Sequence, residues 1–320
     1  MKAHYIADLE VGIEITDFFL LKQAAVRTGA NQKQFIDMIL SDKTGNVNAK
    51  KWDASEKDIE AVGRIQGSAV IKVRANINEW QGKKQLKVSR FRAATEGDGL
   101  DYGDYIKTAP EDGGSMYQEI LDEAGNVSDP DLRNIALAVM ERNRDHLLYY
   151  PAASKNHHAE MGGLLWHMKR MLKMGKRACE VYTDLDRDWV VTGVIIHDIE
   201  KIREIDSDQW GISPGYSFKG MMLGHITQGV VMIEKLAEEF GVDEEKKVML
   251  QHMILTHHYE PEFGSLKRPM FPEAELLHYL DIFDARFYDM QEALQTTEKG
   301  DFSEKVWTLE NRRVYKPTFR

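Results

Sequence analysis

Cysteine is nearly absent from this sequence. The chain has 320 residues and one cysteine, Cys179, so it cannot close an internal disulfide or build a metal site from several thiolates. Long apolar runs are also missing, since no stretch approaches the roughly 20 residues that a membrane helix needs. Residues 1–15 carry Asp8, Glu10 and Glu14, so we expect no signal peptide. These absences predict a globular protein of a reducing compartment, the cytoplasm.

Basic residues are fewer than acidic residues over the chain as a whole. Lysine and arginine number 42 against 52 aspartate and glutamate, a formal net charge of −10. Taken alone, this excess of acid disfavours a nucleic-acid partner because phosphate repels it. The charge is unevenly distributed, however: residues 1–95 carry +5 and the remainder carries −15. Glycine, aspartate and proline gather after residue 95, as is typical of a linker. We therefore predict a domain over 1–95, a linker with a short helical segment over 96–127, a second domain over 128–310 and a tail over 311–320.

The pattern of the basic N-terminal segment is mostly that of short strands. Apolar and polar residues alternate over 68–75 and 85–91, and apolar runs at 18–22 and 35–40 are rich in strand-forming residues. A glycine turn at 81–82 separates two of these segments. Several short strands in about 80 residues are typical of a small Greek-key barrel such as the OB-fold.

Basic and aromatic residues are interleaved in this segment. Barrels that hold single strands combine basic side chains with flat aromatic platforms. The alternative is that the lysines form a solvated face and the tryptophans fill the barrel. Basic charge concentrated in one part of an acidic chain favours binding. The predicted nucleic-acid-binding residues are Lys50, Trp52, Arg74, Trp80, Lys83, Lys84, Lys87 and Arg90.

Beyond about residue 116 the spacing of apolar residues becomes helical. One stripe runs over 132–139, in a helix that we expect to begin near Asp129 and Pro130, where a capping residue and an early proline are favoured. Residues 189–196 are almost wholly apolar and predict a buried helix. The predicted fold class is therefore multidomain: a small OB-like β-barrel followed by an all-α domain.

The histidines concentrate in the helical segment. Of the 11 in the chain, only His4 precedes position 146. His197 and Asp198 end an apolar run, where a buried helix has little reason to place imidazole beside carboxylate unless the two are paired or bind a metal. Imidazole with carboxylate suits Mn²⁺, Fe²⁺, Zn²⁺ or Ni²⁺. A lone helical histidine is more often a core or surface residue, but the group as a whole predicts a metal centre.

The order of these residues resembles that of the HD-domain metal-dependent phosphohydrolases. The pattern H…HD…D is present, and a further histidine and a histidine doublet match the subset of that group that binds two metals. The residues are His167, His197 and Asp198, and Asp281 for the pattern, then His225, His257 and His258.

Local sequence narrows the resemblance further. In the helical segment the strings are PAASKNHH at 151–158, GGLLWH at 162–167, LGHI at 223–226, QHMILTHH at 251–258 and ELLHYLD at 275–281. Together with 35–52 and 83–87 in the N-terminal segment, they are similar to the YhaM-type 3′→5′ exoribonucleases, which have an N-terminal OB-fold. The resemblance covers nearly the whole chain in the same domain order.

The resemblance implies a metal-dependent 3′→5′ exoribonuclease that hydrolyses phosphodiester bonds of single-stranded RNA to nucleoside monophosphates, with single-stranded DNA as a further substrate class. It implies two divalent ions bridged by Asp198, with Mn²⁺ first and Fe²⁺, Ni²⁺, Zn²⁺ and Mg²⁺ as alternatives. We expect Asp284 to bond a ligating imidazole. No membrane partner is expected, and homo-oligomers are left open. The implied metal ligands are His167, His197, Asp198, His225, His257, His258 and Asp281; the implied catalytic residues are Asp198, Lys201 on the phosphate, and His158 on the substrate or leaving oxygen.

The sequence departs from the family pattern at a few positions. Glu200 and Tyr259 stand where glycine is usual, and Leu266 replaces a proline. We expect a carboxylate at position 200 to add negative charge close to an arriving phosphate. Two alternatives stay open: an HD phosphohydrolase of nucleotides or cyclic dinucleotides, and a non-catalytic nucleic-acid-binding protein with a weakened HD site. The OB-like segment disfavours the first, because a small substrate needs no strand-holding module.

Overall fold

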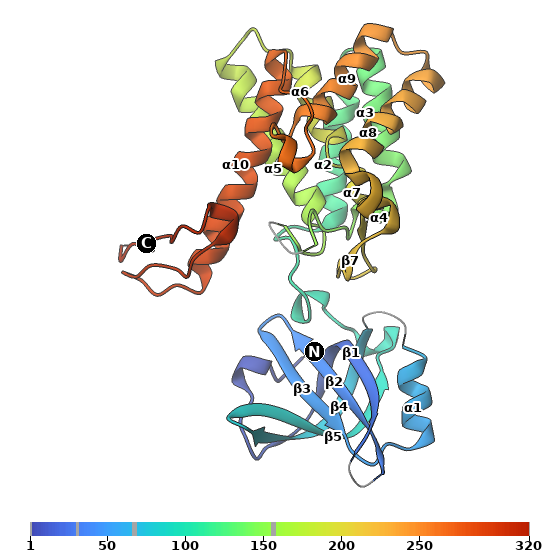
Figure 1. Ribbon diagram of the computed structural model, residues 1–320, viewed down its shortest axis with the longest axis vertical. Helices are drawn as coiled ribbons and strands as arrows, with labels where there is room; N and C mark the ends of the chain where they lie inside the picture. The colour runs from blue at the N-terminus through green and yellow to red at the C-terminus, as the bar shows by residue number, and fades with distance from the viewer. Residues whose placement is uncertain (1, 30–31, 66–68, 155–157, 320) are drawn as a thin grey trace. The chain divides into compact units, whose positions relative to one another are not determined.

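Contacts along the chain divide it into two units, Met1–Thr108 and Ala109–Arg320, each described by itself below (Figure 1). The computed structural model describes residues 2–29, 32–65, 69–154 and 158–319. The string at 151–158 is therefore only partly described, since Lys155, Asn156 and His157 lie outside these ranges.

The first unit is a closed five-stranded barrel, and the predicted fold class is confirmed. Its strands are β1 (Glu14–Thr28), β2 (Gln34–Asp42), β3 (Gly45–Lys51), β4 (Ala69–Trp80) and β5 (Lys83–Ala93), with helix α1 (Glu56–Gly63) between β3 and β4. The strand order is β1-β2-β3-β5-β4, and β1 pairs with β4 to complete the ring. The neighbours are antiparallel except β3 and β5, which pair in parallel. A closed ring leaves no long sheet edge open to other chains.

Alternation along the strands fills the interior of the barrel. On β4, Val73, Ala75 and Ile77 are buried while Arg74 and Asn76 are exposed. Because successive side chains on a strand point to opposite faces, this pattern directs the apolar residues inward and the polar ones to the surface. The barrel therefore has its own hydrophobic core.

The second unit is helical around a separate core. Within the described residues, it has no helix long and apolar enough to cross a membrane, and neither has the barrel. Its elements are α2 (Gly113–Gly125), α3 (Pro130–Arg142), α4 (Arg144–Leu147), α5 (Gly163–Val181), α6 (Arg187–Ile196), α7 (Lys201–Glu204), the two-residue strands β6 (Ile205–Asp206) and β7 (Gly215–Tyr216), α8 (Phe218–Phe240), α9 (Glu244–Thr256) and α10 (Pro272–Gln295). Short 3₁₀ helices lie at Ile6–Asp8, Glu96–Asp98, Tyr102–Asp104, Pro261–Phe263 and Trp307–Leu309.

Two helices of this unit begin and run as their sequences predict. Asp129 caps α3, and its side chain accepts hydrogen bonds from the backbone N–H groups of Asp131 and Leu132 at 2.9 and 3.2 Å. Pro130 occupies the first turn, where its missing N–H costs nothing. In α6, every residue from Val190 to Ile196 is buried, so this apolar helix runs through the core and carries the residues that follow it into the interior.

The segment predicted as a linker, 96–127, contains a helix that packs in the core. On α2, Met116, Ile120 and Ala124 recur at four-residue spacing and are fully or almost fully buried. The helix belongs to the helical unit, which begins at Ala109. Glycine and aspartate before residue 115 obscure this stripe in the sequence.

The C-terminal segment is attached to the end of α10. Phe302 and Tyr315 form an isolated bridge, and the ammonium of Lys316 donates to the carbonyl oxygens of Leu294 and Thr297, both at 2.7 Å. In Figure 1 this segment, drawn in dark red, lies beside the far end of α10.

Candidate metal centre and nucleic-acid surface

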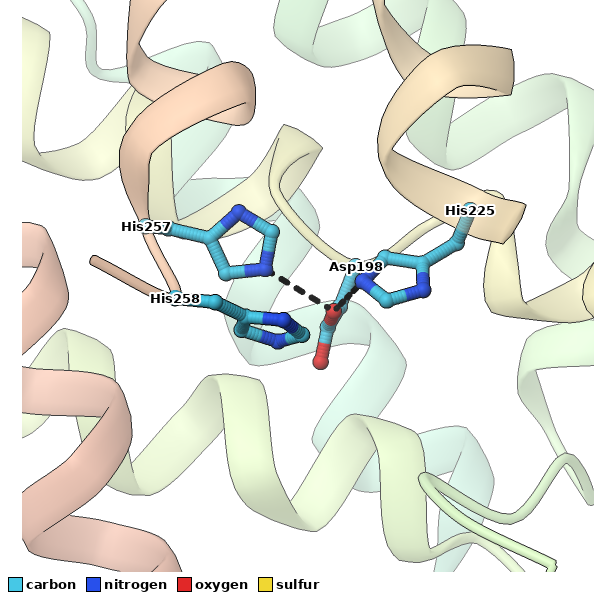
Figure 2. Close-up of side chains that lie close together, drawn as sticks. All are labelled: Asp198, His225, His257 and His258. Carbon is cyan, nitrogen blue, oxygen red and sulfur yellow. Dashed lines mark ion pairs between the residues drawn. The ribbon is translucent and has the colours of Figure 1, made fainter. Parts of the chain in front are cut away.

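Asp198 is the centre of a buried histidine cluster in the helical unit (Figure 2). Its carboxylate is fully buried, in the turn between α6 and α7. The ammonium of Lys201, in the first turn of α7, lies 2.5 Å from Asp198 Oδ2. The buried stretch 190–196 of α6 is thus followed by a charged group in the interior, which is costly unless positive charge surrounds it.

Three histidines from α8 and the end of α9 lie around Oδ1 of Asp198. Figure 2 shows Nε2 of His225 and of His257 aimed at this oxygen, at 3.4 and 3.6 Å. His258 completes the group, and one ligand atom from each of the four residues lies within 4.8 Å of the others. We name Asp198, His225, His257 and His258 the Oδ1 group.

A second set of side chains meets at Oδ2 of the same carboxylate. Nε2 of His197 lies 3.4 Å from Oδ2, and Nε2 of His167, from α5, lies 3.9 Å from it. Oδ1 of Asp281, from α10, lies 3.4 Å from Nε2 of His167. We name Asp198, His167, His197 and Asp281 the Oδ2 group. The structure thus brings all the predicted metal ligands together, with one oxygen of Asp198 in each group.

The hydrogen bonds of the ring nitrogens show which of them are acceptors. Nδ1 of His197 lies 2.8 Å from the carbonyl oxygen of Val194, and Nδ1 of His257 lies 2.7 Å from that of Ile254. A carbonyl can only accept, so each Nδ1 carries a proton and each Nε2 of a neutral ring presents a lone pair. Two sets of lone pairs, on imidazole and on carboxylate, therefore face each other across 3.4 to 3.6 Å.

A cation between these atoms would resolve the conflict. Nε2 of His197, His225 and His257 and Oδ1 of Asp198 are buried and make no hydrogen bond within the part of the chain that the structure describes. Buried polar atoms without a partner are rare and point to an ion or a water. Imidazole nitrogen with carboxylate oxygen is also a donor set that divalent transition metals prefer. The residues present therefore fit a divalent metal.

The protonation states of the Oδ1 group favour the same conclusion. Burial lowers the pKa of His225 and of His257, and burial together with neighbouring His257 lowers the pKa of His258 to about 4. Burial acts to raise the pKa of Asp198, but Lys201 together with His197 and His257 outweighs it and holds that pKa well below its usual range. Neutral imidazoles beside an ionised carboxylate are in the state that metal ligation requires.

Asp284 of α10 links two predicted site residues. Nε2 of His158 lies 2.7 Å and Nδ1 of His167 2.8 Å from its Oδ2, and Nε of Arg170 lies 2.7 Å from its Oδ1. Asp284 thus contacts the imidazole of His167, one of the predicted ligands, as expected. Burial alone lowers the pKa of His167, but Asp281 and Asp284 outweigh it and raise that pKa to about 9. His158 is fully buried on the Nδ1 side of His167, opposite the ring atom that faces Asp198.

Glu204, the last residue of α7, is a site residue that the sequence did not reveal. Its carboxylate accepts from the backbone N–H of His225 at 3.0 Å and contacts Nδ1 of the same ring at 2.9 Å. A ligating histidine commonly donates its outer N–H to a carboxylate, which turns the other nitrogen toward the metal. The sequence contains no local signal for this pair, because 21 residues separate the two partners.

Two of the three departures from the family pattern, Glu200 and Tyr259, have distinct surroundings. The side chain of Glu200 is 5% exposed, and its Oε1 lies 2.6 Å from Nη1 of Arg203. Burial raises the pKa of this carboxyl group. It lines a cavity that contains none of the predicted ligands, so its charge is directed to that cavity and to Arg203. Tyr259 has a φ of +68°, a backbone region that favours glycine, and its ring lies 4.7 Å from that of His278.

Four of the predicted nucleic-acid-binding residues gather on one part of the barrel. Trp52, Trp80 and Lys87 line a hollow of about 490 Å³, and the ammonium of Lys50 lies 5.4 Å from the ring centre of Trp52. Trp52 is 44% exposed and Trp80 67% exposed, so the alternative in which the tryptophans fill the barrel is wrong. Exposed rings beside lysines are the arrangement that binds stacked bases and phosphates.

The other four predicted residues lie apart from this hollow. Lys83 and Lys84 line a different depression, of about 750 Å³. The guanidinium of Arg74 pairs with Glu14 at 2.8 Å, and Arg90 is the exposed partner of Arg74 in the β4–β5 register. The eight residues therefore do not form one continuous set of contacts.

The strand order, the helical unit and the ligand order together define an HD-domain protein with an N-terminal barrel. The family model described as HD domain matches residues 164–286. The curated 3'-5' exoribonuclease YhaM of Geobacillus sp. (strain WCH70) is 38% identical over 98% of this chain and 95% of its own length. The protein of the same name from Bacillus subtilis (strain 168) is 36% identical over 97% of this chain and 97% of its own length. The one from Listeria monocytogenes is 36% identical over 98% of this chain and 98% of its own length. This chain belongs to the YhaM family.

A solved structure also aligns with part of the chain. The second OB-fold domain of replication protein A from Methanococcus maripaludis covers 29% of this chain and 95% of its own, at 13% identity and a TM-score of 0.24. A similarity at this TM-score carries no argument, and the barrel is assigned from its strand order and closure.

Proposed function

We propose that this chain is a metal-dependent 3′→5′ exoribonuclease that releases nucleoside monophosphates from single-stranded RNA, with single-stranded DNA as a second substrate class. Relatives named 3'-5' exoribonuclease align with it over nearly the full length of both chains. The observation that carries the chemistry is the set of imidazole lone pairs aimed at both oxygens of one buried carboxylate, Asp198.

Two divalent cations are proposed, with Mn²⁺ first and Fe²⁺, Ni²⁺, Zn²⁺ and Mg²⁺ as alternatives. The Oδ1 group would hold one and the Oδ2 group the other, with Asp198 shared between them. When bound, such cations lower the pKa of a water molecule and offset negative charge on the phosphoryl oxygens. Two of the proposed ligands, Asp198 and Asp281, contribute to the negative charge that residues 96–320 carry.

Lys201 and His158 have different proposed roles. The ammonium of Lys201 keeps Asp198 ionised at 2.5 Å, and we assign it the contact with a phosphate oxygen of the substrate. His158 shares Oδ2 of Asp284 with His167. We therefore assign His158 to positioning His167 through Asp284, in place of protonating the leaving oxygen, because its Nε2 is already engaged.

The barrel is proposed to hold the single strand. Trp52 and Trp80 offer exposed ring faces, and Lys50 and Lys87 offer positive charge beside them. Stacking on aromatic rings tolerates any base because every base has a π face, so this surface suits an enzyme that degrades RNA without reading its sequence.

The substitution Asp198→Asn tests this function. It removes the negative charge of the carboxylate that both groups share while keeping the shape of the side chain. We therefore expect no detectable release of nucleoside monophosphates from a labelled oligoribonucleotide with Mn²⁺. RNA binding should be unchanged. The matched control is Asp145→Asn, since Asp145 is 91% exposed. Hydrolysis by Asp198→Asn at the rate of the unaltered chain would refute the site. Faster turnover of mononucleotides or cyclic dinucleotides than of RNA would refute the substrate class.

A further inference from the structure

The helical unit contains a second hollow that is separate from the two ligand groups. It has a volume of about 350 Å³ and lies between α3, the turn before α7, and α8. Pockets for small ligands typically measure about 300–1,000 Å³. Thr227, Val231 and Lys235 line it at four-residue spacing on α8, while His225 lies two residues before Thr227 and thus on another face of the helix.

The charged side chains of this hollow are mainly cationic. Arg142, Arg203, Lys219 and Lys235 line it. Arg142 pairs with Glu239, and Arg203 pairs with the buried Glu200 at 2.6 Å. Across the described stretches of the chain, neither Lys219 nor Lys235 has an ion-pair partner within 4.0 Å. The hollow therefore keeps uncompensated positive charge.

Its remaining walls are apolar or carry neutral hydrogen-bonding groups. Leu223 and Val231, 52% and 48% exposed, make part of the lining apolar. Thr227 and Gln228 add hydroxyl and amide groups. Along α8 the lining has Lys219 and Lys235 at its two ends and Leu223, Thr227 and Val231 between them. The hollow therefore offers cations to a phosphate and an apolar middle to a flat ring.

We propose that this hollow binds the phosphate group of a nucleotide, with Lys219 and Lys235, at its two ends, as the cations that attract it. The phosphate comes either from a free nucleoside monophosphate or from the backbone of a single strand. The site goes beyond the proposed function, because it contains none of the metal ligands and binds without a metal. Glu200 lies in the same hollow and competes with the phosphate for the cations.

The hollow also adjoins the metal centre through the backbone. Glu200 follows Asp198 by two residues and precedes Lys201, within a single turn. A phosphate that binds Arg203 and the lysines would weaken their interactions with Glu200. This change would alter the contacts that hold the turn in which Asp198 lies. Occupancy of the hollow is therefore placed to adjust the Oδ2 contact between Asp198 and Lys201.

Equilibrium binding to the full chain tests the proposal. Adenosine 5′-monophosphate and inorganic phosphate are titrated in excess chelator, so that phosphate bound through metals does not contribute. We expect both probes to bind the unaltered chain, and Lys219→Gln with Lys235→Gln to weaken binding at least tenfold. The control Lys173→Gln with Lys299→Gln removes the same charge from exposed positions outside the hollow. Glu200→Gln is expected to tighten binding, because it removes the competing carboxylate.

A second arm identifies the source of the phosphate. A single-stranded oligonucleotide is titrated onto Asp198→Asn with and without the two lysine substitutions. Loss of oligonucleotide affinity assigns the hollow to the strand, and loss confined to the mononucleotide assigns it to free nucleotide. If neither probe loses affinity on the lysine substitutions, or if no probe binds at millimolar concentration in chelator, the proposal is wrong. Failure of the proposed exonuclease would leave these results unchanged, because no turnover is measured.

Discussion

Among single residues, Glu204 governs how His225 faces Asp198. Its carboxylate holds both the backbone N–H and Nδ1 of His225, so it sets the ring orientation and leaves Nε2 as the free nitrogen. Because residues that orient metal ligands typically contribute about 10–100-fold in metal affinity, we expect Glu204→Ala to weaken Mn²⁺ binding by about that factor. Glu204→Gln, which keeps an acceptor oxygen, should lose less. Calorimetric titration with Mn²⁺ measures both.

Glu238→Gln is the matched control for this experiment, because Glu238 is an exposed glutamate on α8, the helix that carries His225. It should bind Mn²⁺ as the unaltered chain does. Thermal unfolding of each variant without metal separates loss of the fold from loss of orientation. If Glu204→Ala binds Mn²⁺ with full affinity, the ring of His225 is held by other contacts and the positioning role is refuted.

The residues that meet at Asp198 could be predicted at this scale, and only some of their supports could be. His197 and Asp198 stand out because a charged pair interrupts an apolar run, and the histidine doublet and Asp281 follow in a known order. Among the supports, the sequence predicts Asp284, which contacts His167. Glu204 and Arg170 act through contacts between distant segments, which no local spacing encodes. The proposed ligands are therefore visible in the sequence, whereas these two supports are visible only in three dimensions.

At the scale of elements, a break in the helix α8 directs the side chain of His225 toward Asp198. Gly224 has φ +69° and ψ 165°, a conformation essentially confined to glycine. A methyl group there would meet only Oε1 of Glu204, at 3.6 Å, so the cost of Gly224→Ala comes from the backbone. We expect Gly224→Ala to lower the free energy of unfolding by about 1–3 kcal/mol. Urea denaturation followed by circular dichroism measures this.

The control for that substitution is Gly125→Ala, at the end of α2, where an added methyl group meets nothing within 4 Å. It should leave stability unchanged or raise it by up to about 1 kcal/mol, because alanine reduces the freedom of the unfolded chain. Equal stability of Gly224→Ala and the unaltered chain would mean that α8 straightens at no cost, and that its break does not position His225.

Elements with a complete local pattern could be predicted from the sequence. The alternation of β4, the cap of α3 and the apolar run of α6 are each visible in their own residues. The sequence predicts α2 only as a short helical segment of a linker, because glycine and aspartate dominate the residues before it. Its burial in the core could not be predicted, because that burial depends on contacts with helices distant in sequence.

Over the whole molecule, the uneven charge matches two separate tasks. The segment 1–95 carries +5 and forms the barrel, and the remainder carries −15 and contains the carboxylates of the metal centre. A net charge of −10 therefore does not argue against an RNA partner, because bound divalent cations reverse the local charge of an acidic site. Each unit has its own hydrophobic core, so strand holding and hydrolysis should be separable by substitution.

Removing the aromatic platforms of the barrel tests this separation. Each base that stacks on an aromatic side chain contributes about 1–3 kcal/mol, so Trp52→Ala with Trp80→Ala should weaken binding of a long oligoribonucleotide by at least tenfold. Hydrolysis of a small phosphodiester such as bis(p-nitrophenyl) phosphate should stay unchanged, because that substrate has no strand for the barrel to hold. Trp307→Ala is the control, since Trp307 is 69% exposed in the helical unit. Equal losses on both substrates would mean that the tryptophans support the metal centre itself, and unchanged RNA affinity would mean that the strand binds elsewhere.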